Sequence, residues 1–81
     1  MPLTHYDILG IIGVVIILFA YLALQIERLS AQDWRYSALN GVGALLILIS
    51  LIHSFNLPSF IIEIAWLAIS LFGLFRAFQR R

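Results

Sequence analysis

The chain has 81 residues, of which 63% are hydrophobic and 11% are charged, and its net charge is +1. Soluble domains carry close to a quarter charged residues, so in water this chain would expose one continuous apolar surface. We therefore predict a single membrane domain over residues 1–81, and the absence of cysteine excludes a disulfide framework, a thiolate metal site and a cysteine nucleophile.

The first membrane-spanning helix is expected at about residues 8–26. No charged residue lies between Asp7 and Glu27, and about 20 apolar residues cross the hydrocarbon of a bilayer. The segment before this run contains no Lys or Arg, whereas a cleaved signal peptide begins with a basic region. We therefore expect a retained helix.

Two further spans are expected at about 36–55 and 58–78. Ser30 and Asp33 are candidate caps ahead of the second span. The third follows a tight turn at Asn56-Leu57-Pro58-Ser59, with Pro58 in the first helical turn, where a missing N–H costs nothing. The fold class predicted is an all-α, up-down-up bundle of three transmembrane helices.

Arginines set the predicted orientation. They occupy the first connection (Arg28, Arg35) and the end of the third span (Arg76, Arg80, Arg81), and there is no Lys. The positive-inside rule places these regions in the cytoplasm. We predict a multi-pass protein of the bacterial inner (cytoplasmic) membrane, with the N-terminus outside and the C-terminus inside.

Each span carries a stripe of small or polar residues at helical spacing. The stripes are Gly10, Gly13, Ile17 and Ala20; Asn40, Gly43, Ile47, Ser50 and Ser54; and Glu63, Trp66, Ser70, Gly73 and Ala77. The three stripes could face a common axis. For the small residues, including Gly41, we favour the interpretation of helix-packing contacts, because small side chains let membrane helices approach closely.

Glu63 is the sharpest polar feature. It lies about 7 Å below the outer boundary, counted from Pro58 at about 1.5 Å per residue. An acid within a span costs on the order of 1–3 kcal/mol, so it must face protein or water. Two interpretations stay open: a proton-accepting or cation-binding group, or a neutral acid that donates a hydrogen bond to Ser50 or to a carbonyl.

The candidate intramembrane site therefore comprises Glu63, Trp66, Ser50, Asn40 and His53. His53 is favoured as an interfacial histidine. Asn40 is expected to form an interhelical hydrogen bond near Gln25 rather than a substrate contact. Neither His5 nor His53 has metal-ligand spacing with an acid and no nucleophile–base pair is present, so we predict no metal, no cofactor and no enzymatic activity.

The pattern resembles a family of short bacterial three-helix inner-membrane proteins without an established function, some of which carry permease-like labels. The resemblance covers nearly the whole chain and rests on Tyr21, Leu39-Asn40-Gly41, Ser50, Asn56-Leu57-Pro58, Glu63, Trp66 and Ser70. Its most specific part is the Asn-Leu-Pro turn followed by Glu-x-x-Trp.

A more distant similarity is to the SemiSWEET and PQ-loop group of half-transporters, which work as homodimers. It lies in length, topology and the Leu57-Pro58 start of the third span, with Glu63 near the offset of a pocket Asn in that group. The chain differs from that group in having Leu24-Gln25 in place of Pro-Gln, and Ile47 near the position of a pocket tryptophan.

Two functions remain open from the sequence. One is a homo-oligomeric half-transporter or small-solute permease subunit, in which a second copy shields the polar stripe, with a dimer favoured. The other is an accessory or structural protein that binds a larger membrane partner. Membrane lipid is an expected partner of both, and nucleic acid of neither, because five arginines in two regions form no continuous basic face.

Overall fold

The computed structural model describes residues 3–79, which form three antiparallel helices. They are α1 (His5–Gln25), α2 (Trp34–His53) and α3 (Leu57–Gln79). Each is long and apolar enough to cross a membrane, and each begins and ends within three residues of the predicted span. Arg80 and Arg81, which contribute to the predicted orientation, lie outside the described residues.

The start of α1 is fixed by a capping box that the sequence prediction missed. The Asp7 backbone N–H donates to Thr4 Oγ1 at 3.1 Å, and the Thr4 N–H donates to Asp7 Oδ2 at 3.0 Å. Two backbone donors that would otherwise lack partners are thereby satisfied. The signal for this cap is Thr-x-x-Asp directly before the apolar run.

The end of α1 closes in a Schellman motif. The Arg28 N–H donates to the Ala23 carbonyl at 2.9 Å and the Glu27 N–H donates to the Leu24 carbonyl at 3.1 Å. This geometry places Glu27 in the left-handed region, at φ 64°, a position usually held by glycine. The chain then turns back towards α2.

Asp33 and Asn56 cap the next two helices. Asp33 Oδ1 accepts from the Arg35 N–H at 2.9 Å, as expected of a cap, whereas the predicted cap Ser30 contributes only its carbonyl, to the Asp33 N–H. Asn56 Oδ1 accepts from the Ser59 N–H at 3.0 Å. Pro58 is the second residue of α3, where no helical hydrogen bond requires its nitrogen.

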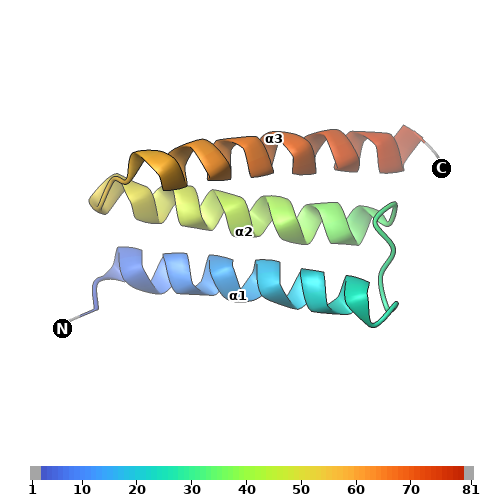
Figure 1. Cartoon of the computed structure of the whole chain (residues 1–81), viewed down its shortest axis with the longest axis horizontal. Helices are drawn as coiled ribbons and strands as arrows, with labels where there is room; N and C mark the ends of the chain where they lie inside the picture. Colours follow the sequence, from blue (N-terminus) through green and yellow to red (C-terminus); the bar gives the residue numbers. More distant parts are fainter. Residues whose placement is uncertain (1–2, 80–81) are drawn as a thin grey trace.

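The three helices form one layer, with α2 between α1 and α3 (Figure 1). No Cα atom of α1 lies within 8 Å of one in α3, whereas α2 packs against both. This arrangement differs from the bundle considered from the sequence, in which three stripes meet at one axis. The reason is that α2 carries small residues on two sides, and each side packs against a different neighbour.

The seam between α1 and α2 depends on glycine. A Cβ atom at Gly13 would lie 2.6 Å from the Gly43 carbonyl oxygen, and one at Gly10 would lie 2.7 Å from Ser50 Oγ. A Cβ at Gly43 would lie 2.6 Å from Ile17 Cγ1. These separations are shorter than van der Waals contact, so this pair of helices can approach this closely only without those side chains.

The seam between α2 and α3 is looser. A Cβ at Gly73 would meet Ser37 Oγ at 2.6 Å, but a Cβ at Gly41 would come no closer than 3.6 Å to Ser70 Cβ. Within residues 3–79 no large side chain is fully buried, and the buried hydrophobic residues are alanines: Ala20, Ala23, Ala44 and Ala77. The leucine, isoleucine and phenylalanine side chains therefore cover the outside of the layer, as they do where lipid is the solvent.

Candidate functional site

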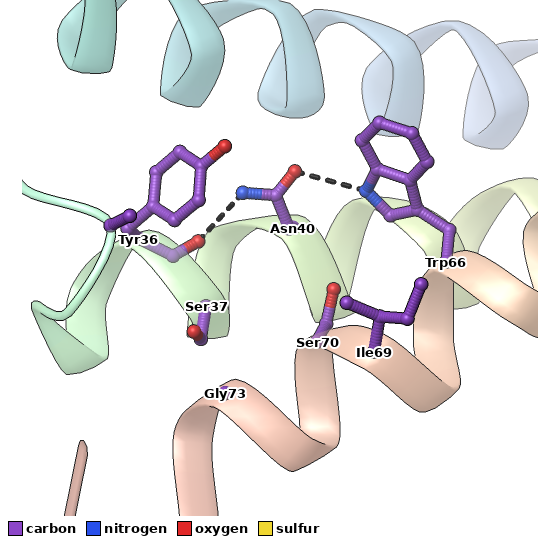
Figure 2. A pocket seen from close by; sticks show the side chains of 8 residues that line it. Tyr36, Ser37, Asn40, Trp66, Ile69, Ser70 and Gly73 are labelled. Atoms are coloured by element: carbon purple, nitrogen blue, oxygen red, sulfur yellow. Dashed lines mark hydrogen bonds between the residues drawn. The ribbon is translucent and has the colours of Figure 1, made fainter. Parts of the chain in front are cut away.

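A polar link joins α2 to α3 at Asn40. This side chain is 4% exposed. Its Nδ2 donates to the Tyr36 carbonyl at 2.8 Å and its Oδ1 accepts from Trp66 Nε1 at 3.0 Å (Figure 2). The bond is interhelical, as expected, but it crosses to α3 rather than pairing with Gln25 on α1. Both ends of the Asn40 amide are thus occupied within the protomer.

A groove lies beside this link, between α2 and α3 (Figure 2). It has a volume of about 360 Å³ and is lined by Ala31, Tyr36, Ser37, Asn40, Trp66, Ile69, Ser70 and Gly73. Ser37 is buried here and was not singled out from the sequence. Its position one helical turn before Asn40 is the signal that could have identified it.

Glu63 lies in a second groove, one turn before Trp66 on α3. This groove has a volume of about 180 Å³ and is lined by Val14, Ile17, Leu18, Ile47, Ile62, Glu63 and Trp66. It is therefore lined by residues of all three helices. The Glu63 side chain is partly exposed, and its Oε1 atom is shielded from solvent without a hydrogen-bond partner among residues 3–79.

Ser50 and His53 lie apart from Glu63 in contact with α1. Ser50 Oγ packs against Gly10, so it does not serve as the hydrogen-bond partner considered for the acid. The exposed His53 ring stacks on Tyr6, with ring centroids 5.0 Å apart and an interplanar angle of 1°. Counting residues along the hairpin placed Ser50 at the depth of Glu63 but could not show that it faces the other neighbour.

The structure thus relates three of the five predicted site residues through Trp66, which bonds to Asn40 and lines the groove of Glu63. Trp66 connects the two grooves, since it lines both. No group of three or more His, Cys, Asp or Glu side chains in residues 3–79 is arranged to hold a metal ion. The chemistry available at this place is that of one carboxyl group, one indole ring and apolar walls.

A protein-family model matches residues 6–81, which is nearly the whole chain, and the family is uncharacterised. No curated protein and no solved structure matches the chain.

Proposed function

The chain belongs to the uncharacterised family whose model it matches, and we propose from its own residues that it is one subunit of a homo-oligomeric membrane carrier for small solutes. The observation that carries this proposal is the Glu63 carboxyl group. It lies in an apolar groove and its Oε1 atom has no hydrogen-bond partner among residues 3–79.

Membrane insertion is supported by the exterior of the layer. All three helices have the length and composition of membrane spans. Arg28 and Arg35 belong to the end where α1 joins α2, and Arg76 lies in the last turn of α3 at the same end (Figure 1). By the positive-inside rule this end lies in the cytoplasm, with the start of α1 outside, in a bacterial inner membrane.

A second copy of the chain would shield the Glu63 groove from lipid. Facing lipid, the Glu63 groove would place an ionisable group in hydrocarbon, which costs on the order of 1–3 kcal/mol. Two copies packed together over this groove would enclose the Glu63 grooves of both copies between six helices. The resulting cavity would lie at the interface between the two copies, as the binding sites of transporters lie between paired repeats.

An accessory role is the second candidate, and the Asn40–Trp66 hydrogen bond favours it. Because each end of the Asn40 amide bonds inside the protomer and the residue is 4% exposed, it is poorly placed to contact a solute. In an accessory protein the face with Glu63 would contact a larger membrane protein. The carrier ranks first because the Glu63 carboxyl retains an unused hydrogen-bonding atom.

Charge movement in proteoliposomes tests the carrier. The purified chain would be reconstituted and exposed to gradients of amines, amino acids, sugars and organic acids, with currents recorded on a supported membrane. We expect at least one class of solute to give a current that Glu63→Gln abolishes. The matched control is Glu27→Gln, which changes an exposed acid in the connection after α1.

A current that persists in Glu63→Gln would reject the role of this carboxyl group. The absence of current with every class, together with a monomeric mass in detergent by light scattering, would reject the homo-oligomeric carrier and favour the accessory role.

A further inference from the structure

We propose that the groove containing Glu63 and Trp66 binds a small organic cation, such as a short-chain alkylammonium ion. This inference rests on the proposed carrier function, because it names the substrate class of the same site. It is carried by the charge of the groove, by the position of the indole ring and by the absence of further oxygen ligands.

The groove contains one acidic side chain and no basic side chain. Among its lining residues Glu63 alone has an ionisable side chain, and the others, apart from Trp66, are aliphatic. The arginines of the described chain are Arg28, Arg35 and Arg76, and none of them lines the groove. An ionised carboxylate there has no protein counter-ion, so a positively charged ligand is the complement that the site lacks.

Trp66 supplies a second feature that suits a cation. Its indole N–H is held by Asn40 Oδ1 at 3.0 Å, which fixes the ring, and the residue remains 42% exposed. Figure 2 shows the ring directed away from α3, across the face of α2. The face of an indole attracts ammonium groups through its quadrupole, most strongly where water is excluded.

The remaining lining selects an organic ion over a metal ion. Magnesium and calcium take about six or more oxygen ligands, water included, and this groove provides one carboxyl group among aliphatic walls, which offer no hydrogen bonds to a shell of water ligands. Val14, Ile17 and Ile47 instead offer methyl and methylene surface to the alkyl arms of an ammonium ion. A volume of about 180 Å³ suits a cation with a few short arms rather than a large aromatic dye.

Binding of tetraethylammonium to the full chain in nanodiscs tests this inference. In a Trp34→Phe background Trp66 is the sole tryptophan, so its fluorescence reports the groove. We expect a saturable change in emission that is absent in Glu63→Gln. Affinity should rise with pH, because a protonated Glu63 is neutral and no longer attracts the cation.

The contribution of the ring is isolated by comparing Trp66→Phe with Trp66→Leu in calorimetric titrations. Both variants lose the bond to Asn40 and keep an apolar side chain, so the main difference between them is the aromatic face. We expect Trp66→Leu to bind tetraethylammonium about 5- to 30-fold more weakly than Trp66→Phe. Circular dichroism would verify that both variants retain the helices.

Three results would overturn the organic-cation site: no saturable binding to the unmodified chain, equal affinity in Glu63→Gln, or equal affinity in the two Trp66 variants. If Glu63 takes up protons but no ammonium ion binds, the organic-cation site is rejected by the first of these results. Transport of another class of solute would in that case still support the proposed carrier. Conversely, ammonium binding without any transport would support the site and reject the carrier.

Discussion

The side-chain amide of Asn40 links α2 to α3. Its donor end satisfies the Tyr36 carbonyl one turn earlier on α2, and its acceptor end reaches Trp66 on α3. Among residues 3–79, the bond to Trp66 is the one side-chain hydrogen bond that joins two helices. The same bond holds the indole ring that we assign to cation binding. At this residue, stability of the α2–α3 seam and geometry of the proposed site depend on the same contact.

A double-mutant cycle measures that contact. The variants Asn40→Ala, Trp66→Phe and their combination would be unfolded in mixed micelles and followed by circular dichroism. Interhelical hydrogen bonds in membranes contribute about 0.6–1.7 kcal/mol, so we expect a coupling energy in that range. If the two single effects are simply additive, the hydrogen bond does not stabilise the fold.

Asp33 provides a pH-dependent contact outside the spans. The Arg35 side chain donates to its carboxylate at 2.8 and 3.2 Å and the Arg35 backbone N–H donates at 2.9 Å, and these bonds hold the pKa of Asp33 below its ordinary 3.8. A carboxyl group with a lowered pKa in the folded state stabilises that state above its unfolded pKa. This contribution is lost as pH falls below 3.8 and through the lowered folded value.

Arg35→Gln therefore raises the pKa of Asp33 towards 3.8. The rise should be incomplete, because the backbone N–H of residue 35 still donates to the carboxylate. Carbon-13 NMR of the carboxyl group during an acid titration measures it. An unchanged or lower pKa in the variant would show that the ion pair is absent in solution.

Glycines determine how closely the helices approach, and two of them on α2 provide a matched comparison. A Cβ at Gly43 would lie 2.6 Å from Ile17 Cγ1 and 2.8 Å from the Gly13 carbonyl oxygen, whereas one at Gly41 would have 3.6 Å to its nearest neighbour. We expect Gly43→Ala to be less stable than Gly41→Ala by about 1–3 kcal/mol, the usual cost of overpacking.

Thermal unfolding in detergent would give both values. Because each substitution changes helix propensity by the same amount, the difference between them reports the seam alone. Equal stabilities of the two variants would contradict the close approach of α1 and α2.

The contrast between helix ends and helix faces shows what can be predicted from sequence. The helix ends follow from the length of apolar runs and from local chemistry at Asp33 and Pro58, since both act within a few residues. Which neighbouring helix each face of a helix contacts could not be predicted in the same way. The spacing of Asn40 and Ser50 places them on one stripe of α2, yet Asn40 bonds to α3 and Ser50 packs on α1. Helical periodicity gives no rotation of a helix against its neighbours.

At the scale of the whole molecule, α2 separates α1 from α3, which have no Cα atoms within 8 Å of each other. Large apolar side chains stay exposed throughout the described chain, and the Glu63 groove lies among residues of all three helices. Lipid can solvate the apolar surface but not the acid. The apolar surface is therefore suited to lipid, whereas the groove that holds Glu63 calls for a protein neighbour, which is why we propose a homo-oligomer.

The orientation of the layer can be tested because the chain contains no cysteine. Single cysteines at Ser30, in the connection after α1, and at Ser54, directly after α2, would report the two ends; both positions are exposed. Since Arg28 and Arg35 flank Ser30, we expect Ser54→Cys to react with a membrane-impermeant maleimide in intact cells. Ser30→Cys should react only after permeabilisation. The reverse pattern would invert the topology, and labelling of both in intact cells would contradict a single orientation across the membrane.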